Sequence, residues 1–193
     1  MIREDLQKYF SQIDSNAKNI SITDIDGLEI EESLAYKKIY SKLERIQKER
    51  AVIHFIGNGA SASIASHFSL DYFKAGQIRT NTFNDLSALT AYGNDISFDE
   101  VFAYPISRTI DKDDMLIAVS SSGNSPNIVR GLEAAKVNGA FLLTLSGMKS
   151  NNKIRKIGDI NMYFPEMDYG PTECAHTIML HHILDTFVDM NIK

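Results

Sequence analysis

Residues 115–147 read MLIAVSSSGNSPNIVRGLEAAKVNGAFLLTLSG. A short apolar run comes first, a polar loop with four serines and one glycine follows, and an amphipathic segment then leads to a second apolar run. Short, continuous apolar runs bounded by glycine are typical of strands buried in a parallel sheet, and a helix commonly connects two such strands. The stretch therefore predicts a strand–loop–helix–strand unit.

The same alternation of apolar runs and helical patterns continues on both sides of this unit. It predicts a doubly wound, flavodoxin-like α/β core with five parallel strands. Ligands of such sheets bind beyond the carboxyl ends of the strands. The other predicted elements are strands at 51–57, 79–83 and 159–164 and helices at about 60–74 and 172–190.

The first 49 residues have a different pattern. Apolar residues at spacings of three or four, such as Ile2, Leu6 and Phe10, predict an amphipathic helix over 2–15, and a similar pattern predicts another over 29–49. The stretch NISITDIDG between them is interpreted as a connector. We expect one domain over 1–193, with N-terminal helices at 1–49 and the α/β core at 50–193.

Composition excludes several classes of protein. The chain has 193 residues, 44% of them hydrophobic, and a net charge of −5 without a basic cluster, which argues against nucleic acid as a partner. No apolar run is long enough to span a membrane, and the first residues do not form a signal-peptide pattern. One cysteine, Cys174, excludes an internal disulfide and fits a reducing compartment, so we expect a cytoplasmic protein.

The serine loop that begins at residue 120 has the composition of an anion site. A loop that leads from a strand into a helix leaves backbone N–H groups unpaired, and the helix dipole adds partial positive charge. Ser120, Ser121, Ser122 and Ser125 add hydroxyl donors. Helix capping is the alternative interpretation, but a cap accounts for one serine rather than four.

The ligand of this loop is expected to be small. GNGASA at 57–62 lacks the third glycine of the dinucleotide fingerprint, and the chain contains no phosphate-binding G-x-x-x-x-G-K-[ST] motif. Because few cationic residues lie near either polar loop, a phosphate monoester fits better than a triphosphate.

Four segments carry a resemblance to a known family. They are GNGASASIASHF (57–68), ALTAYGNDISFDEVF (88–102), SSSGNSPNIVRGLEAAKVNG (120–139) and TECAHTIMLHHIL (172–184). The chain resembles the sugar isomerase (SIS) domain family over nearly its whole length. The serine loop alone indicates the SIS group, and its combination with GND and a histidine-containing last helix is similar to the phosphoheptose isomerase branch.

The resemblance implies ligands for a sugar phosphate in the loops and on the last helix. Asp95 is also interpreted as a cap of the following helix. The implied substrate-binding residues are Asn58, Ser61, Asn94, Asp95, Ser120, Ser121, Ser122, Ser125 and Glu173.

The resemblance also implies a zinc site, with one ion held by His67, Asp71, Glu173 and His181. Zinc accepts imidazole and carboxylate ligands. Asp71 and His181 are the implied catalytic pair. The family has glutamate where this chain has Asp71 and glutamine where it has Glu173, so the implied proton transfer departs from the family pattern at two positions.

Helical phase separates the polar residues of the last helix. Glu173 lies on the apolar stripe, His181 lies roughly 80° from it at the edge of the stripe, and His182 lies opposite it beside acidic residues. His181 is therefore the expected site histidine, with His176 as the first alternative and His182 as a solvated residue.

The activity implied by the resemblance is isomerisation of sedoheptulose 7-phosphate to D-glycero-D-manno-heptose 7-phosphate in a homotetramer with shared sites. Because Asp71 and Glu173 depart from the family, a non-catalytic SIS module that binds a sugar phosphate or a protein remains an alternative. An isomerase of another sugar phosphate, such as a pentose phosphate, is a third interpretation.

Overall fold

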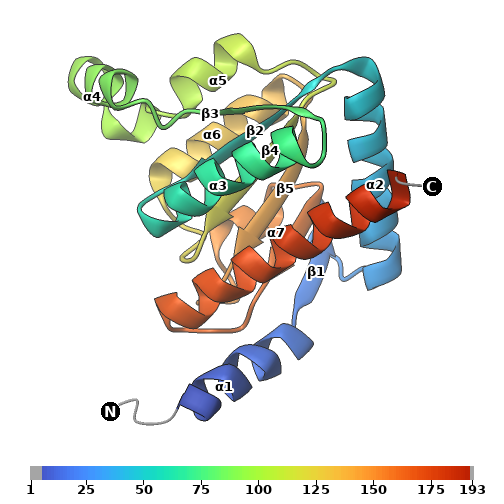
Figure 1. The fold of residues 1–193 in the computed structure, drawn as a ribbon. Helices are drawn as coiled ribbons and strands as arrows, with labels where there is room; N and C mark the ends of the chain where they lie inside the picture. The colour runs from blue at the N-terminus through green and yellow to red at the C-terminus, as the bar shows by residue number, and fades with distance from the viewer. Residues whose placement is uncertain (1–5, 192–193) are drawn as a thin grey trace.

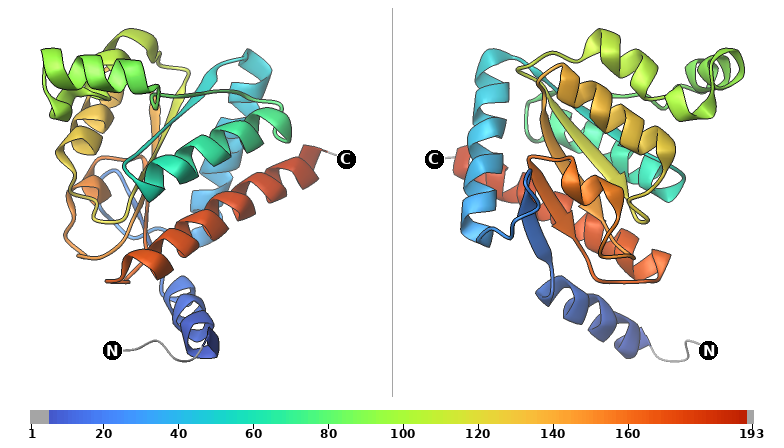
Figure 2. Two further views of the ribbon diagram at one scale, coloured as in Figure 1. Left: turned by 60° about the vertical axis from the view of Figure 1, so that its left-hand side comes forward. Right: turned by 180° about the vertical axis from the view of Figure 1, so that it is seen from behind.

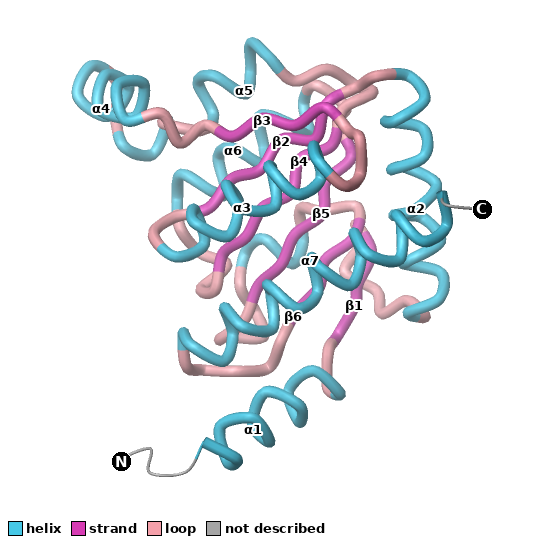
Figure 3. The backbone as a smooth tube through the Cα atoms, in the orientation of Figure 1, coloured by secondary structure: helices cyan, strands magenta, loops and turns pink. Residues whose placement is uncertain are grey.

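A computed structural model describes residues 6–191. Six strands in these residues form one sheet in the order β1-β6-β5-β4-β2-β3 (Figures 1 and 3). The strands are β1 (Ser21–Asp24), β2 (Val52–Gly57), β3 (Arg79–Thr82), β4 (Met115–Ser120), β5 (Phe141–Ser146) and β6 (Ile160–Tyr163). The helices are α1 (Leu6–Lys18), α2 (Glu32–Glu49), α3 (Ala60–Lys74), α4 (Leu86–Asp95), α5 (Ala103–Thr109), α6 (Pro126–Val137) and α7 (Tyr169–Asn191), with short 3-10 helices η1 (Phe98–Glu100) and η2 (Lys153–Lys156).

The five strands predicted from the sequence pair in parallel, which confirms the doubly wound α/β core. Numbered from β2, their order is that of flavodoxin-like sheets, in which the strand order reverses between β2 and β4. Gly57 at the end of β2 pairs with Val119 near the end of β4. The loops after these two strands therefore emerge side by side, at the position where such sheets bind ligands.

The sheet has a sixth strand that the sequence interpretation missed. β1 lies within the stretch interpreted as a connector and pairs antiparallel with β6, so that interpretation was wrong. Asn161 of β6 supports the pairing, because its Nδ2 donates to the carbonyl oxygens of Asp24, at 3.0 Å, and of Thr23. Four residues at a sheet edge give too short a pattern to separate from a loop, and the pairing depends on contacts distant in sequence.

Helices cover both faces of the sheet, as the strand pattern requires (Figure 2). In β4, Met115, Ile117 and Val119 pack in the apolar cluster that includes α2, α3 and α7. The alternate residues Leu116 and Ala118 pack in the second cluster, with α5 and α6. This two-sided burial is the reason that β4 is apolar throughout.

Two segments project from this core. α1 lies below the sheet in Figure 1, buries Ile13, and exposes Leu6 and Phe10. α4 projects at the opposite end and buries none of its residues. Both amphipathic N-terminal helices were predicted, although Ile2 and the start of the first predicted helix lie outside the described residues. Within residues 6–191, no helix is long and apolar enough to cross a membrane.

Candidate active site

A cavity of about 270 Å³ lies where the loops after β2 and β4 meet the start of α7. Seven of the nine residues expected to bind a sugar phosphate line it, so the topology brings together residues far apart in sequence. The lining residues are Asn58, Gly59, Ala60, Ser61, Ser120, Ser121, Ser122, Ser125, Tyr169 and Glu173.

Internal hydrogen bonds shape the serine loop between β4 and α6. The N–H of Gly123 donates to the carbonyl oxygen of Ser120, at 3.0 Å, and to its Oγ, at 3.2 Å. Gly123 has a φ of +61°, and a Cβ there would lie 2.2 Å from Oδ1 of Asn152. Only glycine fits this combination of left-handed backbone and close contact. The tight turn places the next residues at the start of α6.

Two of the serine hydroxyls lack the hydrogen bonds that would tie them to the loop or to α6. Ser121 is 5% exposed, and its Oγ makes no hydrogen bond within the described structure. Ser125 is the N-cap residue of α6, but its side chain makes no capping hydrogen bond. A buried, unpaired hydroxyl beside a helix N-terminus is costly without a partner, and an anion supplies that partner.

The loop after β2 is tied by two amides to the first turn of α6, which directly follows the serine loop. Asn58 Nδ2 donates to Asn127 Oδ1 and Asn127 Nδ2 donates to Asn58 Oδ1, each at 2.9 Å. The Asn58 side chain therefore holds the two loops in register, although the residue lines the cavity as expected. Ser61, in the first turn of α3, is 5% exposed and completes that wall.

A second group of polar residues lies on α3 and α7. One ligand atom from each of His67, Asp71 and His181 lies within 4.8 Å of the others. His67 Nε2 is 3.2 Å from Asp71 Oδ2, and the His67 and His181 rings are 5.6 Å apart. Two imidazoles and one carboxylate whose ligand atoms lie this close together form a set of ligands that zinc accepts. Because His67 is half-exposed, the group is open to solvent on one side.

The polar residues of α7 follow the predicted helical phase. Glu173 is half-buried and faces the serine cavity, but its carboxylate is not part of the His67, Asp71 and His181 group. His181 is half-buried and belongs to that group. His182 is exposed, with its ring against an aromatic residue of α2.

His176, the first alternative to His181, is fully buried and packs against Phe164. Burial lowers its pKa to about 4, with the backbone of Ser146 acting in the opposite direction. A neutral imidazole in this position is part of the core rather than of the ligand-lined surface.

Two expected residues do not reach the cavity in this chain. Asn94 and Asp95 end α4, are exposed, and make a hydrogen bond to each other, at 2.9 Å. Neither lines the serine cavity. Conversely, Tyr169 lines the cavity without having been predicted, because it lies before the first periodic residue of the last helix.

Comparisons with known proteins agree with this geometry. The SIS domain family model matches residues 9–147. The phosphoheptose isomerase of Helicobacter pylori (strain Shi470) is 33% identical over 182 residues, covering 83% of this chain and 94% of that protein.

Solved structures show the same fold. A phosphoheptose isomerase from Francisella tularensis superposes with a TM-score of 0.81 at 22% identity, over 98% of this chain and 100% of the other. The phosphoheptose isomerase GmhA from Neisseria gonorrhoeae gives a TM-score of 0.80 at 23% identity, over 97% and 99% of the two chains. This chain is therefore a member of the SIS domain family and belongs to its phosphoheptose isomerase branch.

Proposed function

We propose that this protein is an aldose–ketose isomerase that converts sedoheptulose 7-phosphate to D-glycero-D-manno-heptose 7-phosphate. The observation that carries the proposal is the pairing of two sites on the same helices. α3 and α7 each contribute to the serine cavity at one end and to the His67, Asp71 and His181 group further along. The similarity to phosphoheptose isomerases supplies the substrate.

The serine cavity binds the phosphate in this proposal. The Ser121 and Ser125 hydroxyls and the N-terminal N–H groups of α6 donate to phosphate oxygens. Glu173 lines the same cavity, and a carboxylate repels a phosphate at this range. We therefore assign its carboxylate to sugar hydroxyl groups, to which it offers acceptors.

The reacting end of the sugar lies at the His67, Asp71 and His181 group. Ser61 and His67 are separated by about 9 Å along α3, and Glu173 and His181 by about 12 Å along α7, at 1.5 Å per residue. This separation favours a phosphorylated sugar with a long carbon chain over a short one.

Isomerisation of the ketose requires two linked proton movements. A base removes a proton from C1 to form the enediol, exchanges it with solvent and delivers a proton to C2, while an acid–base group moves a proton between the oxygens on these carbons. Asp71 and His181 are the proposed pair, because both side chains reach the same small volume. The distance between His67 Nε2 and Asp71 Oδ2, 3.2 Å, allows His67 to orient the Asp71 carboxylate.

We propose a zinc ion at this group, one per site, held by one atom each of His67, Asp71 and His181. The second carboxylate oxygen of Asp71 and the second ring nitrogen of His181 would then remain for proton transfer. When bound, the ion would stabilise negative charge on the oxygens of the enediol. Three protein ligands with an open side are typical of catalytic rather than structural zinc sites. Glu173 was expected as a fourth ligand, and its position on the serine cavity favours substrate contact instead.

A homotetramer with shared sites accounts for the exposed apolar surface. Leu70 is 59% exposed on α3, the helix that carries His67 and Asp71. The projecting α4 segment exposes Leu86 and ends at Asn94 and Asp95. In an assembly, Asn94 and Asp95 would approach the site of a neighbouring subunit. This position would agree with the family resemblance, which implies that both residues bind substrate. Light scattering of the purified protein would give the assembly mass directly.

Turnover distinguishes the proposed enzyme from its alternatives. The protein would be incubated with sedoheptulose 7-phosphate and, separately, with a ketopentose phosphate, each with added zinc, and products followed by NMR. We expect the heptose aldose to accumulate faster. Faster turnover of the pentose phosphate would correct the substrate. Thermal stabilisation by the sugar phosphates without turnover would favour a non-catalytic module.

A phosphorylated metabolite as substrate, together with the single cysteine, favours a cytoplasmic location.

A further inference from the structure

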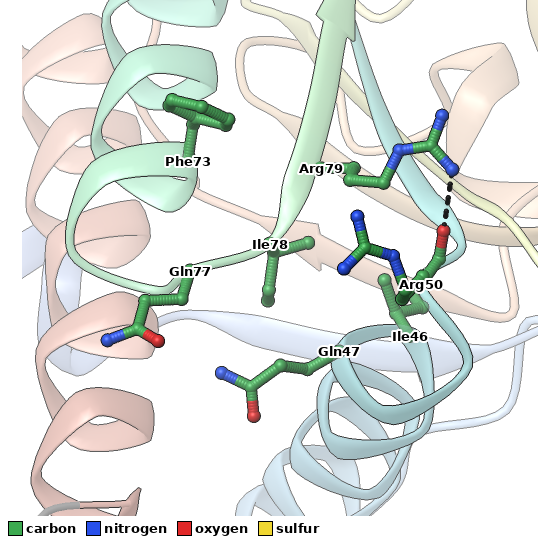
Figure 4. Close-up of a pocket in the computed structure, with 7 residues that line it drawn as sticks. All are labelled: Ile46, Gln47, Arg50, Phe73, Gln77, Ile78 and Arg79. Atoms are coloured by element: carbon green, nitrogen blue, oxygen red, sulfur yellow. Dashed lines mark hydrogen bonds between the residues drawn. The ribbon is translucent and has the colours of Figure 1, made fainter.

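A second cavity, of about 310 Å³, lies at the opposite edge of the sheet from the candidate active site. It is formed where α2 and α3 end and β3 begins (Figure 4). The length of β2, six residues or about 20 Å, separates the two edges. The lining residues are Ile46, Gln47, Arg50, Phe73, Gln77, Ile78 and Arg79.

Two arginines give this cavity its charge. Arg79 Nη1 donates to the backbone carbonyl oxygen of Arg50, at 2.8 Å, which holds the Arg79 side chain against the end of α2 (Figure 4). Among the described residues, neither guanidinium forms an ion pair, and no acidic side chain lines the cavity. Glu49, the neighbour of Arg50, is already paired with Arg45, at 2.9 Å.

The remaining lining residues are suited to the uncharged part of a ligand. Gln47 is held by its Nε2, which donates to the carbonyl oxygen of Gly76 at 2.8 Å, so its Oε1 stays available as an acceptor. Phe73 is 61% exposed and presents a ring, while Ile46 and Ile78 are buried. Apolar and aromatic walls with a few polar or charged groups are the usual composition of a small-molecule site.

The backbone is also unusual at this cavity. Arg50 has a φ of +58° and Gln77 a φ of +52°, and these are two of three non-glycine residues with positive φ in residues 6–191. Glycine adopts this conformation at lower energy than arginine or glutamine. A long cationic side chain at such a position beside the cavity is consistent with a role for Arg50.

We propose that this cavity binds a small phosphate monoester that carries a planar group. The phosphate accepts hydrogen bonds from the guanidinium groups of Arg50 and Arg79, a pairing that planar guanidinium favours. The planar group packs on Phe73. This site is distinct from the serine cavity and lies beyond the proposed isomerase function, since it holds no acid–base pair.

Adenosine 5′-monophosphate is a suitable probe because it carries a phosphate monoester and a planar base. Inorganic phosphate and adenosine test these two parts separately. The methyl signals of Ile46 and Ile78 would be followed by NMR during titration of the intact protein. We expect both signals to shift with the monophosphate, more weakly with inorganic phosphate, and the monophosphate affinity to fall with added salt. Absence of any shift at millimolar monophosphate would overturn the proposal.

The positive φ values provide a matched pair of variants. Arg50→Gly and Gln77→Gly both relieve a left-handed backbone, but only the first removes a cation. We expect Arg50→Gly to weaken binding at least tenfold and Gln77→Gly to change it less than threefold, with turnover of the sugar phosphate unchanged in both. Equal weakening by the two variants would contradict the proposal. So would a smaller assembly mass for Arg50→Gly, because the arginine would then be paired across a subunit interface.

Discussion

Ser121 lines the serine cavity, and its buried hydroxyl makes no hydrogen bond within the described residues. Replacing Ser121 with alanine would remove a hydrogen bond to the ligand but no hydrogen bond within the protein. We predict that Ser121→Ala raises the KM for the sugar phosphate about tenfold, the equivalent of about 1.4 kcal/mol, with a free energy of unfolding close to that of the parent.

Ser120 provides the control for this prediction. Its Oγ accepts a hydrogen bond from the Gly123 N–H, at 3.2 Å, within the loop itself. Ser120→Ala should therefore lower the free energy of unfolding by about 1 kcal/mol, as measured by denaturant titration. An unchanged KM for Ser121→Ala would place the phosphate elsewhere.

Glu173 places a carboxylate beside the proposed phosphate position. We predict that Glu173→Gln, which keeps the size of the side chain, tightens inorganic phosphate binding about threefold because it removes a repulsive charge. The measurement is calorimetric titration at low ionic strength. Glu133→Gln on the exposed side of α6 removes one negative charge away from the cavity and should leave the affinity unchanged. Weaker phosphate binding by Glu173→Gln would show that the carboxylate does not face the phosphate.

Residue identities and their spacing are sufficient to predict most of the cavity. The serines, Ser61 and Glu173 follow from loop chemistry, family resemblance and helical phase. Tyr169 does not, because a single aromatic residue ahead of a helix carries no periodic signal. The pairing of Asn58 with Asn127 joins residues 69 apart in sequence, and only the sheet order brings them together.

At the scale of elements, the turn between β4 and α6 depends on Gly123. A Cβ at this position would collide with the Asn152 side chain and would hold alanine in a left-handed conformation. We predict that Gly123→Ala destabilises the protein by about 2 kcal/mol or more and also abolishes phosphate binding, because the loop must move.

Gly139 is the matched control for that substitution. It also has positive φ, at +80°, but a Cβ there meets only Lys112, at 3.4 Å, far along the chain from the cavity. Gly139→Ala should destabilise by about 1 kcal/mol while phosphate still binds, as thermal unfolding with and without phosphate would show. Phosphate binding retained in Gly123→Ala would contradict the proposed role of the turn.

Long periodic elements were the most predictable ones. α3 was predicted at about 60–74 and spans Ala60–Lys74, and β4 was predicted from the run that it occupies. β1 was missed because pairing with β6 rather than local pattern makes it a strand. α4 was not assigned either, since it has no buried stripe to reveal a helical period.

At the scale of the whole molecule, His176 links stability to pH. Burial holds its pKa at about 4 in the folded state, against an ordinary value near 6.5. Between these two values the unfolded chain binds more protons, so the free energy of unfolding decreases as the pH falls from 6.5 towards 4. At pH 5, His176 alone should lower the free energy of unfolding by about 2 kcal/mol relative to neutral pH.

The substitution His176→Leu tests this contribution. Neither ring nitrogen forms a well-aligned hydrogen bond in the described structure, so a leucine of similar size loses little. Urea unfolding at pH 7 and pH 5 should show a smaller decrease for the variant than for the parent. Equal decreases in both proteins would mean that His176 is protonated without unfolding.

The central claim is that two sites along α3 and α7 have different roles. The serine cavity holds the phosphate, and Asp71 and His181 move the protons. The most direct measurement is ¹H NMR of sedoheptulose 7-phosphate in D₂O with zinc, comparing the parent protein with His181→Asn. The account predicts an aldose product carrying deuterium at C2 with the parent, and at least a hundredfold slower formation with the variant at unchanged phosphate affinity. Equal rates of aldose formation in the two proteins, or none with a parent protein that binds the sugar phosphate, would contradict it.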